Sequence, residues 1–216
     1  MRVRRSFERP EGKKSAKLIV IASEGVGTET IYFNAVKDCL CARNVHMKIL
    51  ERETTDSSPE VVLSQLKQFE AEYSLEEDDE LWMVIDRDRW TDKTLSDVAQ
   101  KCHQNKYLFF AMSNPCFELW LLLHFEDINE MSEVEVEALK ANKRVSKRGD
   151  KWLKSRVRRC MGSYHETGYD TDLLMPYVKR ARDRAEALDT EKKNRWPQTI
   201  GTRVYRLIDS ITAFNQ

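Results

Sequence analysis

The chain has 216 residues, 36 basic and 36 acidic side chains that give a formal net charge of zero, and a hydrophobic fraction of 41%. This fraction is close to that of globular proteins with a packed core, and only seven glycines and five prolines exclude collagen-like and low-complexity classes. A zero net charge gives no general argument for nucleic-acid binding, although local charged patches remain open.

Residues 1–16 are basic and polar, and we expect them to form a flexible tail without the apolar run of a signal peptide. The longest apolar stretch, around residues 119–123, is far shorter than the roughly 20 residues of a membrane span. Five cysteines show neither zinc-ligand nor disulfide-framework spacing. These features predict a soluble, cytoplasmic protein that does not enter a membrane.

Apolar strand-like runs alternate with helical periodicities through the first part of the chain. The first run, Lys17-Leu-Ile-Val-Ile-Ala22, is β-branched and typical of a buried strand, and a turn at residues 23–28 follows it. We expect strands at residues 17–22, 45–50, 81–85 and 107–111, and helices at residues 29–43, 58–73, 92–105 and 116–125. This alternation predicts an α/β fold with a four-stranded parallel sheet between helices over residues 17–125.

Residues 126–216 contain no strand-like run, and we expect a helical C-terminal region whose last two helices are separated at Trp196-Pro197. Within it, residues 142–160 hold nine Lys or Arg and one Asp, whereas residues 126–137 hold six acids and no base. Such polarisation indicates a basic surface for a polyanion, with a solvated helix face as the alternative. The candidate contacts are Lys147, Arg148, Lys151 and Arg156.

Acidic residues stand at the ends of the predicted strands. Glu24 follows the first strand, Asp86 and Asp88 end the third, and Glu118 lies one turn into the apolar helix after the fourth. Sites in open parallel sheets lie at the carboxyl ends of strands, so these groups converge if the first strand neighbours the third. Clustered carboxylates favour a hard cation such as Mg²⁺ or Mn²⁺, which supports phosphodiester or phosphoryl-transfer chemistry.

Each of these acids also has a structural interpretation. Glu24 could be a polar turn residue, and the Asp-x-Asp pair could cap a turn. Glu118 is expected to be largely buried among apolar neighbours, where a salt bridge with Arg87 or Arg89 is the alternative to a metal.

The segment Ser113-Asn114-Pro115 precedes the apolar helix. Asn114 is expected to be its N-cap, with Pro115 at the first helical position, and the exposed amides there could hold a phosphate. Arg87, Ser113 and Asn114 are therefore the candidate nucleic-acid contacts near the acids.

Three segments together resemble the RloB family, a Toprim-like group of prokaryotic proteins. They are Glu24-Gly-x-Gly-Thr-Glu29, Trp82-Met-Val-Ile-Asp-Arg-Asp88 and Ser113-Asn-Pro-Cys-Phe-Glu-Leu-Trp-Leu-Leu-Leu-His-Phe125. The resemblance implies a Toprim-like core in which Glu24 is the general acid/base and Asp86 and Asp88 hold Mg²⁺. It also implies a restriction-linked or phage-defence role, such as abortive infection, often beside an ATPase encoded nearby.

The chain departs from the family pattern at Tyr164-His165-Glu166, because the family often has Tyr-x-Lys there. If that lysine serves a phosphate, Lys147, Lys151 or Arg156 has to replace it.

We therefore expect a Mg²⁺-dependent, Toprim-type nuclease that cleaves DNA or RNA, including tRNA, with Glu24 and Glu118 as catalytic carboxylates. The alternative is an inactive Toprim-like adaptor that binds a partner ATPase or a nucleic acid, and homo-oligomers are open in either case. A HAD-like phosphatase is disfavoured, because its Asp-x-Asp nucleophile motif usually follows the first strand of its domain.

Overall fold

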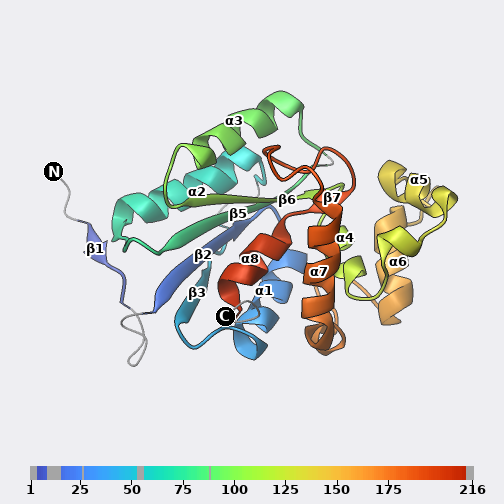
Figure 1. Cartoon of the computed structure of the whole chain (residues 1–216), viewed down its shortest axis with the longest axis horizontal. Coiled ribbons are helices and arrows are strands. Elements are labelled where there is room, and N and C mark those ends of the chain that lie inside the picture. Colours follow the sequence, from blue (N-terminus) through green and yellow to red (C-terminus); the bar gives the residue numbers. More distant parts are fainter. Residues whose placement is uncertain (1–3, 9–15, 26, 53–55, 88, 213–216) are drawn as a thin grey trace.

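The computed structural model describes residues 4–8, 16–25, 27–52, 56–87 and 89–212. A twisted sheet runs through the molecule with helices on both of its faces (Figure 1). The predicted α/β architecture is confirmed.

The central sheet has five strands in the order β3-β2-β5-β6-β7. They are β2 (Lys17–Ser23), β3 (Val45–Ile49), β5 (Glu80–Asp86), β6 (Leu108–Asn114) and β7 (Gly201–Thr202). The first four are parallel and lie where the sequence predicts them, whereas β7 pairs antiparallel with the end of β6. The expectation that residues 126–216 contain no strand is therefore wrong, because a two-residue strand leaves no periodicity to detect.

Helices cover the two faces unequally. They are α1 (Thr28–Cys39), α2 (Pro59–Glu72), α3 (Asp92–His103), α4 (Glu118–Leu123), α5 (Glu133–Ala141), α6 (Trp152–Met161), α7 (Val178–Leu188) and α8 (Val204–Ile211), with short 3₁₀ turns at Ile128–Glu130, Thr171–Leu173 and Met175–Tyr177. In Figure 1, α2 and α3 lie on one side of the sheet, α1, α7 and α8 lie on the other, and α5 and α6 stand beside α4.

Alternation along β2 divides the buried side chains between two cores. Leu18 and Val20 face the core under α2 and α3, whereas Ile19 and Ile21 face the larger core under α1, α4, α7 and α8. Successive strand residues point to opposite faces, so a strand buried on both sides is apolar throughout. This explains why β2 reads as one continuous hydrophobic run.

The C-terminal region shares its core with the α/β part. Leu139 of α5, Val157 of α6 and Ile208 of α8 belong to the same buried cluster as Ile19 and Trp120. The helices therefore pack as part of one layered structure and not as an appendage with a core of its own.

A segment that we call the strap, residues 189–203, connects α7 to α8. Trp196 is buried in the core under α2 and α3, and a buried ion pair at 3.0 Å joins Asp189 to Arg203 at its two ends. The predicted separation of the last two helices at Trp196-Pro197 is confirmed.

The predicted start of the apolar helix is wrong. Asn114 ends β6, a cis peptide bond joins it to Pro115, and α4 begins at Glu118. Because Asn114 pairs with Gly201 of β7, the sheet extends to the position where the sequence indicates a helix cap.

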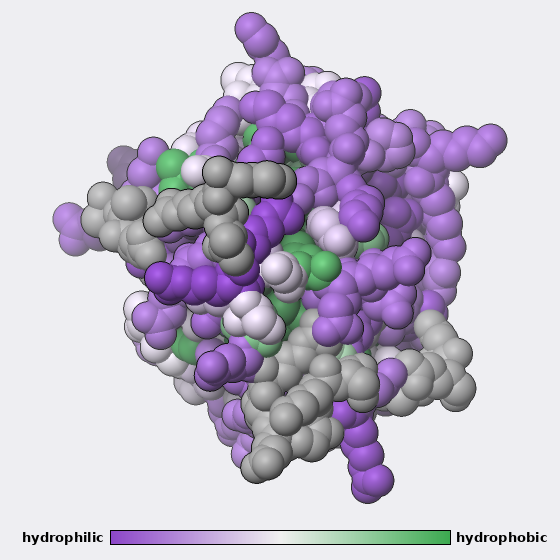
Figure 2. Space-filling model, turned by 90° about the vertical axis from the view of Figure 1, so that its left-hand side faces the viewer, coloured by the Kyte–Doolittle hydropathy of each residue, from purple (hydrophilic) through white to green (hydrophobic). Residues whose placement is uncertain are grey.

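Part of the predicted N-terminal tail is ordered in the structure. Arg5–Ser6 forms β1, which pairs with β4 (Tyr73–Ser74), and the Phe7 ring packs against Phe69 and Tyr73. Viewed from the left of Figure 1, the described surface is mostly hydrophilic, with hydrophobic residues in small patches (Figure 2). No helix among the described residues is long and apolar enough to cross a membrane.

Candidate active site

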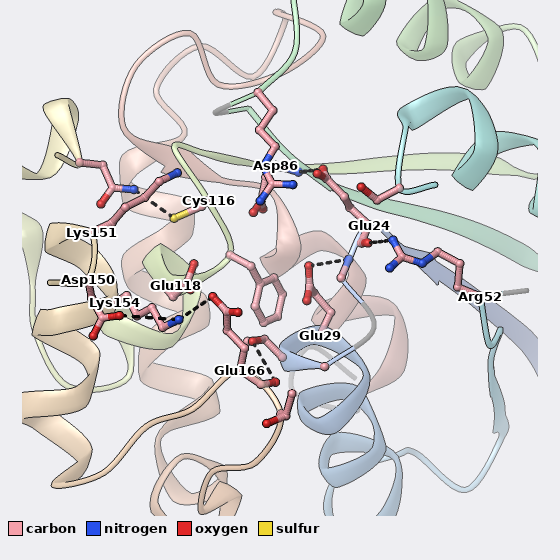
Figure 3. A pocket seen from close by; sticks show the side chains of 18 of the residues that line it. Glu24, Glu29, Arg52, Asp86, Cys116, Glu118, Asp150, Lys151, Lys154 and Glu166 are labelled. Atoms are coloured by element: carbon pink, nitrogen blue, oxygen red, sulfur yellow. Dashed lines mark hydrogen bonds and ion pairs between the residues drawn. The ribbon is translucent and has the colours of Figure 1, made fainter. Parts of the chain in front are cut away.

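A pocket of about 450 Å³ lies where the carboxyl ends of β2 and β5 meet α1, α4 and the start of α6. Its lining is rich in charge of both signs. The acids are Glu24, Glu29, Asp86, Glu118, Asp150 and Glu166, and the bases are Arg52, Arg89, Arg144, Lys151 and Lys154 (Figure 3).

Glu24 lies directly after β2 and is only 7% exposed. Its Oε2 accepts hydrogen bonds from the backbone N of Asp86 at 3.3 Å and from Trp90 Nε1 at 3.1 Å. Its backbone carbonyl accepts a hydrogen bond from Arg52 Nη1 at 2.6 Å. The carboxylate is therefore fixed in place, so Glu24 is more than a polar turn residue.

Asp86 is the last residue of β5, and β5 pairs with β2. The condition that the first predicted strand neighbours the third is met, and this brings Asp86 beside Glu24 in the pocket. Asp88, the second predicted metal ligand on this strand end, lies outside the described residues.

Glu118 is the first residue of α4 and lines the same pocket. It is only partly exposed, and its position at the start of α4 places it in the lining of the pocket. Its Oε1 accepts a hydrogen bond from Tyr164 Oη at 3.4 Å. Within the described chain, Glu118 forms no ion pair with Arg87 or Arg89, the structural alternative.

Glu29 is a buried acid of this pocket to which the sequence analysis gives no role. It sits in the first turn of α1, is 5% exposed, and accepts a hydrogen bond from the backbone N of Gly25 at 3.2 Å. Burial raises the pKa of Glu29 to about 7, and the negative charges of Glu118 and Glu24 add to the rise. The sequence signal that could have identified Glu29 as a site residue is its position in the Gly-x-Gly-Thr-Glu segment, five residues after Glu24.

The two glycines of this segment permit close packing. A Cβ at Gly25 would lie 2.0 Å from Glu29 Oε2, and a Cβ at Gly27 would lie 2.2 Å from the backbone O of Glu166. Both glycines therefore let the loop after β2 approach its neighbours more closely than any other residue would.

A hairpin at residues 143–151 carries the basic wall of the pocket. Asn142, in the left-handed conformation at the end of α5, is buried and its Oδ1 accepts a hydrogen bond from the backbone N of Leu153 at 3.0 Å. Arg144 and Lys151 form a bridge across the hairpin and both line the pocket. Of the predicted basic contacts, Lys151 is thus placed at the site.

Lys154 is a second lysine of this wall that the sequence analysis does not single out. Its Nζ forms an ion pair with Glu166 at 2.8 Å and lies 3.8 Å from Asp150 (Figure 3). Glu166 adds a carboxylate to this side of the pocket, and Lys151 and Lys154 supply cations from α6 and the residue before it.

The remaining predicted nucleic-acid contacts are not at the pocket. Ser113 is fully buried, with its Oγ 2.8 Å from Thr202 Oγ1, and Asn114 donates from Nδ2 to the carbonyl of Pro197 at 3.1 Å. These contacts to β7 and the strap replace the phosphate contact that the sequence indicates.

Two predicted arginines are held by acids instead. Arg87 forms an ion pair with Asp92 at 2.6 Å, and Arg156 forms one with Glu126 at 2.7 Å. Lys147 and Arg148 are exposed at the tip of the hairpin and do not line the pocket.

The donor chemistry of the pocket fits a hard divalent cation. Glu24, Glu29, Asp86 and Glu118 offer carboxylate oxygens, the ligands that Mg²⁺ and Mn²⁺ take. No group of three or more His, Cys, Asp or Glu within the described residues is already arranged to hold a metal ion. Among the described residues, a cation here would draw on Glu24 and Asp86, which adjoin one another.

Comparison with known proteins gives one match. A family model described as RloB-like protein matches residues 19–211. No curated protein and no solved structure matches the chain.

Proposed function

The chain belongs to the RloB-like protein family, and we propose that it is a Mg²⁺-dependent nuclease of Toprim type that cleaves phosphodiester bonds in DNA or RNA. The observation that carries this proposal is the pocket itself. Carboxylates at the ends of two neighbouring parallel strands, Glu24 and Asp86, face a wall of lysines and arginines. Carboxylates bind a divalent metal ion, and lysines and arginines bind phosphate groups. Metal-dependent cleavage of a phosphodiester requires both kinds of group in one site.

The basic wall binds and orients the nucleic-acid backbone. Arg144, Lys151 and Lys154 come from the hairpin and α6, and Lys151 and Lys154 lie across the pocket from Glu24 (Figure 3). A phosphate between these walls is held by charge-assisted hydrogen bonds on one side and lies beside the carboxylates on the other.

The carboxylates serve as metal ligands and as proton-transfer groups, and Glu24 is assigned to both roles. Glu24 and Asp86, with Asp88, would hold the metal. Bound there, Mg²⁺ supplies polarisation of the phosphoryl oxygen and a lower pKa for the attacking water. Glu24, and Glu118 across the pocket, are the groups that accept or return a proton.

A role in phage defence and a partner ATPase follow from the family resemblance, a cytoplasmic location follows from the sequence features, and we retain all three as parts of this proposal. The adaptor alternative shares the same pocket but predicts binding without cleavage.

The decisive experiment incubates the purified protein with plasmid DNA, total RNA and tRNA, each with Mg²⁺, Mn²⁺ or EDTA. We expect cleavage of at least one substrate with metal only, and a loss of about 100-fold or more in the Asp86→Asn variant. Asp97→Asn is the matched control, because Asp97 is exposed on α3 and outside the pocket.

Cleavage in EDTA, or equal cleavage by the Asp86→Asn protein, would refute the metal-dependent site. A folded protein that binds a nucleic acid yet cleaves none of the substrates under any condition would favour the adaptor.

A further inference from the structure

A second pocket, of about 560 Å³, lies between the end of α3, the start of β6 and the strap. It shares no lining residue with the candidate active site. Its lining is basic and aromatic, and consists of Trp82, Ala99, Cys102, His103, Asn105, Lys106, Leu108, Phe109, Phe110, Lys192, Lys193, Asn194, Arg195, Arg203 and Arg206. We call it the strap pocket.

No carboxylate lines the strap pocket, although six lysines and arginines do. Asp189 forms ion pairs with two arginines, Arg203 at 3.0 Å and Arg206 at 2.9 Å. Its single negative charge neutralises only one of the two positive charges. Lys192 is paired with Glu186 at 2.7 Å. Lys193 and Arg195 have no carboxylate partner in the described part of the chain, so the pocket retains an excess of positive charge.

The strap holds these cations in a defined arrangement. Arg195 Nη1 donates to Ser96 Oγ on α3 at 2.9 Å, and the next residue, Trp196, is buried in the core. Both contacts leave the charge of Arg195 in place, because a hydroxyl and an apolar core do not neutralise it. A basic loop anchored in this way is organised before a ligand arrives, which lowers the entropic cost of binding.

An apolar wall faces the cations. Trp82 and Phe109 stack on one face of the sheet, with ring centroids 5.0 Å apart and an interplanar angle of 22°, whereas Leu108 and Phe110 line the pocket from the other face of β6. Phe109 and Phe110 are only partly buried. This wall offers a planar, uncharged group a surface to pack on, which a site for simple ions would not need.

We propose that the strap pocket binds a nucleoside phosphate, with the phosphates on Lys193 and Arg195 and the base against the partly buried ring of Phe109. The volume lies within the range typical of small-molecule pockets. The ligand is either a free nucleotide or the phosphorylated end of a nucleic acid, since both present the same chemistry. This proposal does not depend on the nuclease activity proposed for the other pocket.

An acidic peptide is the competing ligand, but the sheet edge argues against it. A peptide bound by strand addition needs a run of free backbone groups, and β7 already covers Ser113 and Asn114 at the end of β6. The carbonyl of Met112 also accepts a hydrogen bond from the backbone N of Arg203. Only the first residues of β6 remain, which is too short an edge for specific pairing.

The test is equilibrium binding of ATP to the full chain by calorimetry in EDTA, so that no cleavage occurs and failure of the nuclease proposal leaves the result unaffected. The double variant Lys193→Gln/Arg195→Gln, which removes the two cations assigned to the phosphates, should bind ATP about tenfold or more weakly. The matched control is Lys147→Gln/Arg148→Gln, which removes two adjacent exposed cations from the hairpin and should bind ATP normally.

Further arms separate the ligand classes. Binding of one ten-nucleotide DNA is measured with a 5′-phosphate and with a 5′-hydroxyl. Tighter binding of the 5′-phosphorylated DNA than of ATP assigns the pocket to a phosphorylated nucleic-acid end. Tighter binding of ATP assigns the pocket to a free nucleotide. Equal binding of tripolyphosphate and ATP would overturn the role of the aromatic wall. Equal competition by hexaglutamate, equal loss in the control variant, or absence of binding by ATP and both oligonucleotides would overturn the proposal.

Discussion

Replacing Glu29 with glutamine should make the protein more stable at alkaline pH and leave its stability unchanged at acidic pH. Glutamine has the shape of protonated glutamate, and its Oε1 can still accept the hydrogen bond from the backbone N of Gly25. The substitution therefore removes mainly the ability of residue 29 to ionise inside the pocket.

The size of the effect follows from the pKa. Burial, with the charges of Glu118 and Glu24, raises the pKa of Glu29 from 4.5 to about 7 in the folded protein. A folded-state pKa above the unfolded value means that the contribution to stability is full below pH 4.5 and is lost as the pH rises through about 7. The loss amounts to about 3 kcal/mol, and the Glu29→Gln protein should not suffer it.

The assay is urea unfolding of both proteins in EDTA, at pH 5 and at pH 8.5. Buried His124, whose pKa burial lowers to about 4, gives both proteins the same additional pH dependence, so it cancels in the difference. Glu77→Gln is the control, because Glu77 is exposed and its replacement should shift stability by the same small amount at both pH values.

The expected result is a variant that gains about 3 kcal/mol over wild type at pH 8.5 and differs by less than about 1 kcal/mol at pH 5. An equal difference in unfolding free energy between variant and wild type at both pH values would show that the pKa of Glu29 is not raised. The argument for uncompensated negative charge in the pocket would then fail.

Three further substitutions test separate parts of the structure. Gly27→Ala forces a Cβ against a backbone carbonyl 2.2 Å away and should lower the melting temperature, whereas Gly168→Ala, with open space around it, should not. Asp189→Asn leaves two arginines without their carboxylate and should cost about 3–5 kcal/mol in urea unfolding; a loss below about 1 kcal/mol would contradict this. Lys151→Gln should reduce the log–log salt slope of nucleic-acid binding by about 0.7 to 0.9, while Lys147→Gln, outside the pocket, leaves it unchanged.

Local sequence was sufficient to predict the four parallel strands of the central sheet and the acids that follow or end them. Runs such as residues 17–22 are apolar on both faces, so their burial in a parallel sheet could be predicted, and Glu24 and Asp86 then fall at the same edge. Because β2 and β5 are neighbours in the sheet, as this prediction requires, Glu24 and Asp86 line the same pocket as Glu118.

Contacts between residues that are far apart in the chain could not be predicted from local sequence. The contact that fixes Ser113 comes from Thr202, 89 residues later, and nothing near Ser113 indicates it. Arg156 looks free in a basic run until the fold places Glu126 beside it. Lys154 reaches the pocket only because α6 packs beside α4.

The path of the strap has a consequence for synthesis of the protein on the ribosome. Trp196 completes the core under α2 and α3, and Ile208 completes the core on the opposite face of the sheet. Neither layer can close before Trp196 and Ile208 have left the exit tunnel, so the nascent α/β part exposes apolar surface until then. Chaperone contact is therefore expected while the α/β part is being synthesised, and truncation before Trp196 should yield an insoluble product.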